Sequence, residues 1–217
     1  MSLAIFDLDN TLINGDSDVL WGQFLAEHGY VDAPSHEREH ARFYEEYLAG
    51  TVDIHAFLRF QLRELAEHPI ETVDRWRTDY LREKIEPIVL PKAQELLEQH
   101  RTQGNILLII TATNRFITEP IAKVFGIEHL IASEPEIIDG RYTGRVSGTP
   151  SFAEGKVTRL NQWLQDQSLD LVDSWFYSDS HNDLPLLEHI AHPVAVDPDE
   201  KLAIEASKRN WPTISLR

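Results

Sequence analysis

The first residues of the chain place two acidic side chains at the end of a short hydrophobic segment. Residues 3–6 read Leu-Ala-Ile-Phe, and Asp7 and Asp9 follow with one residue between them. A short apolar run of this kind is typical of a buried β-strand. The two carboxylates then lie just beyond the strand end, where they repel each other unless something compensates their charge. On its own the motif is equally common in surface turns, so its meaning depends on the rest of the chain.

The overall composition indicates a folded protein without a basic surface. The chain has 217 residues, 42% of them hydrophobic, which is enough to bury a sizeable core. A formal net charge of −16 argues against nucleic acid or anionic lipid as partners, because both need a basic face. With no recognisable signal peptide or membrane span, we expect a cytoplasmic protein that binds small molecules. Since the chain has no cysteine, any metal is held by oxygen or imidazole.

The hydrophobic pattern divides the chain into two kinds of structure. Residues 14–87 show helical periodicity without a convincing strand, and they carry twice as many acidic as basic residues. From Pro91 onward, helical and strand patterns alternate, as is typical of a parallel sheet. We therefore predict an α/β fold with a Rossmann-like three-layer core of residues 1–13 and 88–217 and an inserted all-helical cap of residues 14–87. After the first strand, strands are predicted at residues 105–110, 130–132, 174–177 and 193–196, with a hairpin turn at Asp139-Gly140.

Polar residues follow several of these predicted strands. In an open parallel sheet, ligands bind beyond the carboxyl ends of the strands, so residues after each strand share one site. The strand ending at Ile110 is followed by Thr111, and the strand ending at Tyr177 is followed by two further acids. The carboxylates expected to meet are those of Asp7, Asp9, Asp179 and Asp183. Such a group requires a cation, and oxygen ligands without cysteine favour Mg²⁺.

A site of this composition suits phosphoryl transfer. One aspartate can attack phosphorus and form an acyl phosphate, while a second protonates the leaving alkoxide and later takes a proton from water. Asp7 and Asp9 suit these two roles. Charge on the phosphoryl oxygens must be neutralised, and Thr111 and Lys156 are candidates for that task. Taken alone, Lys156 is an ordinary solvated helix lysine and Thr111 an ordinary strand end.

Together and in order, the motifs resemble those of the haloacid dehalogenase superfamily, in its phosphoserine-phosphatase-like branch with a helical cap. The motifs that carry the resemblance are Asp7-x-Asp9-x-Thr11, Thr111, Lys156 and Asp179-x-x-x-Asp183. The resemblance covers essentially the whole chain. It implies a Mg²⁺-dependent phosphomonoester hydrolase that acts on a small phosphorylated metabolite through an aspartyl phosphate.

The resemblance also implies a role for each matched residue. Asp7 is the expected nucleophile and Asp9 the expected general acid and base. Thr111 is expected to bind the phosphate and Lys156 to stabilise its charge. The expected metal site comprises Asp7, Asp9 with its backbone carbonyl, Asp179 and Asp183, the last of which also supports the lysine. One departure is Ser178, where relatives often have glycine and where a side chain is expected to crowd the loop.

The cap is expected to decide which phosphate ester is cleaved. Where phosphoserine phosphatases carry a glutamate for the substrate ammonium, this chain has Asp16, although a helix cap is an equally good interpretation of that residue. Where they carry an arginine for the substrate carboxylate, it has Gln61, flanked by Arg59 and Arg63. Without that arginine a buried carboxylate is poorly paired. An amine-bearing phosphate without a carboxylate, with histidinol phosphate as first choice, is therefore expected. The expected substrate contacts are Asp16, Ala112 and Asn182.

Other interpretations stay open at this point. Phosphoserine itself is one alternative substrate, and transfer of the phosphoryl group to an acceptor alcohol is an alternative reaction. A non-catalytic phosphoacceptor module is a remoter alternative, because it needs neither a general acid at Asp9 nor a cap. His36 and His40 have a spacing that can bind zinc on a helix, but an exposed helix face is the expected reading. The sequence sets no oligomeric state.

Overall fold

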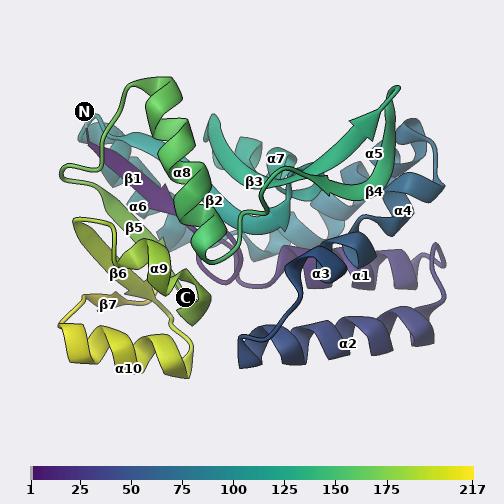
Figure 1. The fold of residues 1–217 in the computed structure, drawn as a ribbon, viewed down its shortest axis with the longest axis horizontal. Helices are drawn as coiled ribbons and strands as arrows, with labels where there is room; N and C mark the ends of the chain where they lie inside the picture. Colours follow the sequence, from purple (N-terminus) through teal and green to yellow (C-terminus); the bar gives the residue numbers. More distant parts are fainter. Residues whose placement is uncertain (1) are drawn as a thin grey trace.

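The hydrophobic segment at the start of the chain forms the central strand of a seven-stranded sheet (Figure 1). The structure, a computed structural model, describes residues 2–217. The strand order is β4-β3-β2-β1-β5-β6-β7, and every neighbouring pair is parallel except β3 and β4, which are antiparallel. The strands are β1 Leu3–Phe6, β2 Ile106–Asn114, β3 His129–Ile138, β4 Arg141–Ser147, β5 Trp175–Ser178, β6 His192–Val196 and β7 Thr213–Ile214.

Alternating side chains of β1 enter two separate hydrophobic clusters, one on each face of the sheet. Ala4 and Phe6 pack on one face, whereas Leu3 and Ile5 pack on the other. This is the period of two that an extended chain requires. Because both faces are covered, the strand is uniformly apolar, as is usual in parallel sheets.

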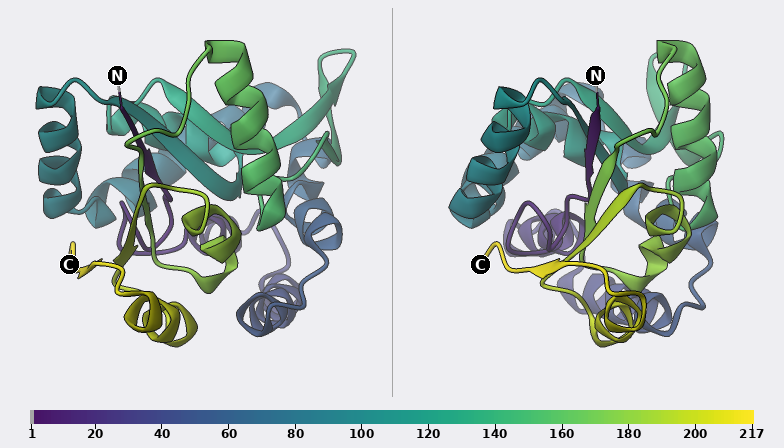
Figure 2. Two further views of the ribbon diagram at one scale, coloured as in Figure 1. Left: turned by 60° about the vertical axis from the view of Figure 1, so that its left-hand side comes forward. Right: turned by 90° about the vertical axis from the view of Figure 1, so that its left-hand side faces the viewer.

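Helices cover both faces and complete the three layers (Figure 2, right). On one face lie α6 Pro91–Thr102 and α7 Arg115–Val124. The other face is covered by α8 Glu154–Gln167, α9 Leu184–Leu187 and α10 Glu200–Arg209. The predicted α/β core is thus confirmed. Within residues 2–217 no helix has the length and apolar character needed to cross a membrane.

The segment between β1 and α6 is helical, as predicted. It comprises α1 Ser17–Glu27, α2 Ala33–Ala49, α3 Ile54–Gln61, α4 Arg63–Glu67 and α5 Ile70–Tyr80, then a π-helix Leu81–Ile85 and a 3₁₀ turn Glu86–Ile88. Trp21 of α1 and Tyr80 of α5 belong to the same hydrophobic cluster as Phe6 of the sheet. Helix α2 instead forms an outer layer, and only His36 and Phe43 of it are buried. The boundaries 14 and 87 of an independent cap stay a prediction.

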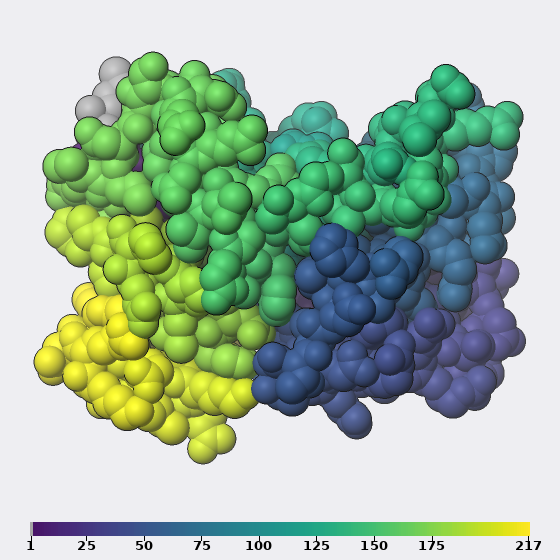
Figure 3. All heavy atoms as spheres, in the orientation of Figure 1, coloured from purple at the N-terminus to yellow at the C-terminus, as the bar shows by residue number. Residues whose placement is uncertain are grey.

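The end of helix α2 also contacts the carboxyl-terminal part of the chain. Lys201 of α10 donates a hydrogen bond from Nζ to the carbonyl of Leu48 at 2.7 Å. Asn182 donates from its side chain to the carbonyl of Tyr47 at 3.4 Å. Both carbonyls are in the last turn of the helix, and that of Tyr47 also accepts from the amide of the capping residue Gly50 at 3.0 Å. Figure 3 shows this junction, where the blue surface of the helical insertion meets the yellow surface of α10.

Several strand boundaries differ from the prediction. Strand β2 continues through Thr111 to Asn114, because β-branched threonines fit a pleated sheet as well as aliphatic residues do. Strand β3 is longer than the predicted 130–132 and runs into the predicted hairpin, whose turn residues Asp139 and Gly140 both have positive φ. Helix α10 was not predicted. Strand β7 was not predicted either, because a two-residue strand carries no periodic signal.

Packing on the sheet should dominate stability. Phe176 of β5 is completely buried in the cluster formed with α8, α9 and α10. Replacing it with alanine removes its contacts and leaves a cavity, so we expect Phe176→Ala to lower the free energy of unfolding by about 3–5 kcal/mol. The exposed hairpin residue Ile137 is the matched control, and Ile137→Ala should change it by less than about 0.5 kcal/mol. Urea unfolding measures both; equal losses would contradict this packing.

Candidate active site

The carboxyl ends of three adjacent strands open into one cavity of about 270 Å³. Strand β1 lies between β2 and β5, so residues that follow or end these strands meet although they are far apart in sequence. The core residues that line the cavity include Asp7, Asp9, Thr111, Ala112, Thr113, Lys156, Asp179, Ser180 and Asp183. Of the residues predicted to be functional, Asn182 alone is absent from the cavity wall; its side chain bonds the carbonyl of Tyr47 instead.

Lys156 joins two of the acids. Its Nζ donates to Asp7 Oδ1 at 2.7 Å and to Asp183 Oδ2 at 2.8 Å, and all three side chains are buried. Burial alone lowers the pKa of a lysine, but the carboxylates of Asp183 and Asp7 outweigh it and raise the pKa of Lys156. The ammonium therefore stays charged throughout the physiological range.

A tight turn before α8 brings this lysine to the strand ends. A Cβ atom added to Gly155 would lie 2.1 Å from the carbonyl oxygen of Pro150, so no other residue fits there without moving the backbone. The amide of Gly155 donates to the carbonyl of Phe152 at 2.8 Å, and that of Lys156 donates to Ala153 at 3.0 Å. Glycine at this position thus sets where the first turn of the helix starts and where Lys156 points.

Both carboxylate oxygens of Asp9 accept hydrogen bonds. The backbone amide of Ser17 donates to Oδ1 at 2.7 Å, and the hydroxyl of Thr113 donates to Oδ2 at 2.9 Å. Thr111 is also near Oδ2, at 3.4 Å. Burial raises the pKa of Asp9, although these hydrogen bonds partly oppose the shift. A carboxyl held this firmly and titrating above its usual range is suited to exchange protons near neutral pH.

Burial and neighbouring carboxylates raise the pKa values of Asp179 and Asp7. Burial, and then the neighbouring Asp183, raises the pKa of Asp179 to about 8, and Thr11 donates to its Oδ1 at 3.2 Å. Burial raises the pKa of Asp7 as well, with Lys156 opposing and the neighbouring acids adding to the shift. The cavity therefore concentrates more negative charge than one lysine balances.

Two hydroxyl residues of the site were not predicted to have a role. Ser178 was expected to crowd the loop, but its hydroxyl is buried and donates to Asp183 Oδ2 at 2.7 Å. Thr113 holds Asp9, as described above. The sequence did contain a signal for Thr113, because residues two apart in a strand face the same side and Thr111 was already assigned to the site.

Asp16 caps the N-terminus of helix α1 and also lines the cavity. Its Oδ1 accepts hydrogen bonds from the amides of Asp18 and Val19, which makes it the N-cap of α1. Burial, and then the nearby Asp9, raises the pKa of Asp16 to about 7. Both interpretations weighed from the sequence are thus compatible with its position.

The helical insertion supplies an aromatic wall. Its residues that line the cavity are Asp16, Asp18, His40, Phe43, Tyr44, Tyr47, Leu48, Val52 and Phe57. Gln61 is buried elsewhere, and neither Arg59 nor Arg63 lines the cavity. Arg63 is paired with Glu64 at 3.2 Å and with Glu39 at 3.5 Å. The expectation of an exposed face for His36 was wrong, since α2 packs this ring beside Gly22 and Phe60.

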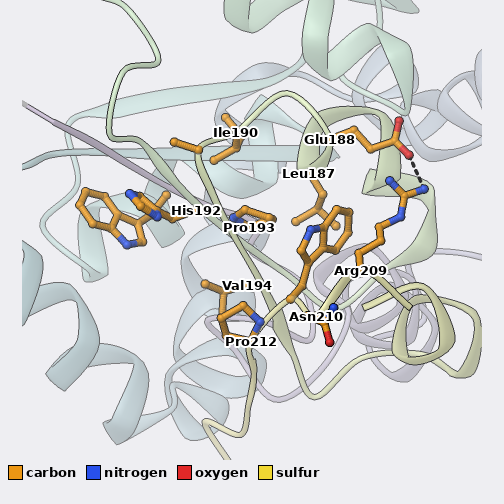
Figure 4. Close-up of a pocket in the computed structure, with 12 residues that line it drawn as sticks. Leu187, Glu188, Ile190, His192, Pro193, Val194, Arg209, Asn210 and Pro212 are labelled. Atoms are coloured by element: carbon orange, nitrogen blue, oxygen red, sulfur yellow. Dashed lines mark ion pairs between the residues drawn. The ribbon is translucent and has the colours of Figure 1, made fainter. Parts of the chain in front are cut away.

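A larger hollow of about 740 Å³ lies at the opposite ends of β5 and β6 (Figure 4). It is lined by residues such as His192, Pro193 and Asn210. Its acid, Glu188, is paired with Arg209 at 2.6 Å. None of the residues singled out from the motifs lines this hollow, so the cavity at the carboxyl ends of the strands is the candidate active site.

The fold and this arrangement of residues are those of a hydrolase family. Residues 4–188 match the haloacid dehalogenase-like hydrolase family, and the chain belongs to it. The relatives described below include a histidinol-phosphatase and phosphoserine phosphatases, and the protein is a phosphatase. The interpretation as a non-catalytic phosphoacceptor module is thereby excluded.

Particular relatives define the branch. The chain is 45% identical to a histidinol-phosphatase of Neisseria meningitidis serogroup C, over 100% of this chain and 99% of the relative. It is 29% identical to a phosphoserine phosphatase of Mycobacterium tuberculosis, over 96% of this chain and 68% of the relative. A crystal structure of a protein of unknown function from Bordetella pertussis matches with a TM-score of 0.94 and 43% identity, covering 100% and 99% of the two chains. A substrate-bound phosphoserine phosphatase shares the fold, with a TM-score of 0.72 at 19% identity, covering 98% of this chain and 92% of that one.

The turn before α8 provides a test of the site geometry. Gly155→Ala forces the backbone away from the Pro150 carbonyl and moves Lys156, so we expect phosphatase kcat to fall about 10²-fold. The control is Gly140→Ala in the hairpin turn, where φ is positive but no atom lies within 4 Å of the added Cβ. That variant should lose about 1–2 kcal/mol of stability and keep its kcat. Steady-state kinetics and thermal unfolding separate the two effects, and a fully active Gly155→Ala protein would contradict the geometry.

Proposed function

We propose that the protein is a Mg²⁺-dependent phosphomonoesterase that forms an aspartyl phosphate and acts on histidinol phosphate. The observation that supports this mechanism is the hydrogen bond from Lys156 to Asp7. Beside it, both carboxylate oxygens of Asp9 accept hydrogen bonds. A nucleophile, an acid and base, and a cation are then within one cavity. The predicted cytoplasmic location and the cap boundaries stay predictions.

The proposed reaction has two steps. In the first, a carboxylate oxygen of Asp7 attacks phosphorus, and the alkoxide that leaves takes a proton from Asp9. In the second, Asp9 takes a proton from water, whose oxygen attacks the phosphorus of the acyl phosphate and releases Asp7. Lys156 favours the ionised form of Asp7 and offsets the charge of the transferred group, and the hydroxyl of Thr111 is available to bind a phosphoryl oxygen.

The donor set fits Mg²⁺. Asp7 and Asp179 supply carboxylate oxygens, and Asp9 supplies the backbone carbonyl expected from the family. The oxygens of Asp183 are engaged by Lys156 and Ser178, so this residue supports the site through the lysine. Among residues 2–217 no three acidic or histidine side chains form a metal-binding group by themselves. Mg²⁺ usually keeps several water ligands, so it needs only a few ligands from the protein. When bound, it would neutralise charge on the phosphoryl oxygens.

The raised pKa of Asp179 gives metal binding a pH dependence. Because Asp179 titrates at about 8 when folded, the folded chain binds more protons than the unfolded chain between about pH 4 and pH 8. Without metal, the free energy of unfolding should therefore fall as the pH rises through this window. Mg²⁺ needs the ionised carboxylate, so it should raise the thermal midpoint more at about pH 8 than at about pH 5. Thermal unfolding with chelator or Mg²⁺ measures this, and Asp179→Asn should lose the response; an unchanged response in that variant would count against the site.

The cavity wall supports a substrate with an amine and an aromatic ring. The helical insertion places aromatic side chains such as Phe43, Tyr47 and Phe57 and the acid Asp16 around the cavity, but no arginine or lysine from residues 14–87. Burial lowers the pKa of His40, so it adds no cation at neutral pH. An ammonium can pair with Asp16 and an imidazole ring can stack, whereas a carboxylate finds no cation on this wall. The 45% identical histidinol-phosphatase supports the same choice.

One observation favours phosphoserine as the second candidate. Arg217 lines the cavity from the core side, and within residues 2–217 its guanidinium donates one hydrogen bond, to the carbonyl of Asn10 at 3.5 Å. A carboxylate entering from that side would meet a cation.

A substrate panel decides between them. We expect kcat/KM to be highest for histidinol phosphate, lower for phosphoethanolamine and lowest for phosphoserine, because only the first fills the aromatic wall and pairs its amine. Asp7→Asn is the control for the chemistry and should lower kcat at least about 10³-fold for every ester. Phosphate release measured with Mg²⁺ provides the comparison. A preference for phosphoserine would overturn the substrate proposal, and an active Asp7→Asn protein would overturn the mechanism.

A further inference from the structure

One hydroxyl in the active site lies between two buried carboxyl groups. Thr113 Oγ is 2.9 Å from Asp9 Oδ2 and 3.2 Å from Asp18 Oδ2. Thr113 and Asp18 are 4% and 3% exposed, so water does not share these contacts freely. Asp18 lies in the first turn of α1, two residues after the N-cap Asp16, and none of the four motifs includes it.

Proton counting constrains this arrangement. A threonine hydroxyl carries one proton, so it donates to only one of the two carboxyl groups at a time. The second contact is a hydrogen bond only if the other carboxyl is protonated and donates to Thr113 Oγ. If both were ionised, one carboxylate oxygen would face the hydroxyl lone pairs in a buried site, at considerable cost.

The surroundings indicate which carboxyl carries the extra proton. Asp9 accepts the short hydrogen bond from the Ser17 amide at 2.7 Å in addition to that from Thr113. In the described part of the chain, the Asp18 carboxyl has one further partner, the side-chain amide of Asn114 at 3.4 Å. Hydrogen bonds favour the ionised form, so in this arrangement the better supplied Asp9 is the anion, the form in which it takes a proton from water in the second step, and Asp18 is the neutral acid.

The charged and titratable groups near Asp18 point the same way. They are Asp16 and Asp9 on the loop before α1 and Tyr80 on α5, whose hydroxyl donates to the Ser17 carbonyl at 2.8 Å. Within residues 2–217 Asp18 forms no ion pair with a lysine, arginine or histidine. Burial, followed by the charges of Asp16 and Asp9, raises the pKa of Asp18 well above its usual range.

We propose that Asp18 is a positioning residue that acts in its neutral form: it donates to Thr113, and Thr113 in turn donates to Asp9. The inference rests on the proposed role of Asp9 as general acid and base. The chain of hydrogen bonds fixes the orientation of the Asp9 carboxyl and the direction of the Thr113 hydroxyl. A neutral Asp18 also spares the phosphate one further negative charge in a cavity already rich in carboxylates.

A pair of substitutions at Asp18 separates charge from hydrogen bonding. Asp18→Asn keeps a neutral side chain whose amide can donate to Thr113, whereas Asp18→Ala removes the donor. With an amine-bearing phosphomonoester and Mg²⁺, we expect Asp18→Ala to lower kcat about 10²-fold with KM within about threefold. Asp18→Asn should stay at least about tenfold more active than Asp18→Ala.

The pH profile provides a readout that a purely structural role would not change. In the wild type, ionisation of Asp18 at high pH breaks the chain, so it contributes to the basic limb of kcat. Asparagine does not ionise, so in Asp18→Asn this limb should move to higher pH. Superimposable profiles, or an Asp18→Asn protein as impaired as Asp18→Ala, would overturn the proposal.

Thr113 supplies an independent pair in case the alanine variant does not fold. Thr113→Ser keeps the hydroxyl and should retain most of kcat, whereas the isosteric Thr113→Val should lose about as much as Asp18→Ala. Thermal unfolding checks that each variant is folded. An inactive wild type, or an Asp9→Asn protein as active as the wild type, overturns the proposed function together with this inference. An active wild type and inactive Asp9→Asn, with Asp18 and Thr113 variants unaffected, overturn this inference alone.

Discussion

The buried ammonium of Lys156 between Asp7 and Asp183 is the interaction on which the active site depends. It joins three segments that are distant in the chain: the end of β1, the start of α8 and the loop after β5. Removing a partner from a buried ion pair leaves an uncompensated charge, so this contact constrains each of the three segments. The glycine before the lysine is the backbone condition for the contact, because a Cβ there would overlap a carbonyl oxygen. The parallel sheet provides the rest, since it aligns the strand ends that carry the acids.

Hydroxyl groups orient three of the buried carboxyl groups of the site. Ser178 orients Asp183, Thr11 orients Asp179 and Thr113 orients Asp9. Each hydroxyl replaces water as a hydrogen-bond donor to a carboxylate in the cavity. A phosphate dianion must enter this acidic cavity, so the balance between ionised and neutral carboxyl groups is part of how the site binds substrate. The helical insertion adds aromatic side chains and the two acids Asp16 and Asp18 to the cavity wall.

Much of the fold and the list of site residues could be predicted because they depend on short-range patterns. An apolar run with acids after it, alternating helices and strands, and an Asp-Gly turn are local signals, and each has its counterpart in the structure. The strand extension through Thr111 to Asn114 was missed because threonine is read as an end of the apolar run although it is stable in a strand. Strand β7 was missed because its place depends on pairing with β6, which no local pattern encodes.

The sequence by itself determined the order of the motifs, and with it the α/β class, the family and the residues that can react. These follow from residue types and spacing along one chain. Only the tertiary structure decided which oxygen meets which donor: Lys156 with Asp7 and Asp183, Ser178 with Asp183, and one Thr113 hydroxyl shared by Asp9 and Asp18. It also decided that Gln61, Arg59 and Arg63 do not line the cavity, while His40 and Arg217 do. The reason is physical, because hydrogen bonds and burial depend on distances of a few tenths of an ångström between segments that the sequence does not relate.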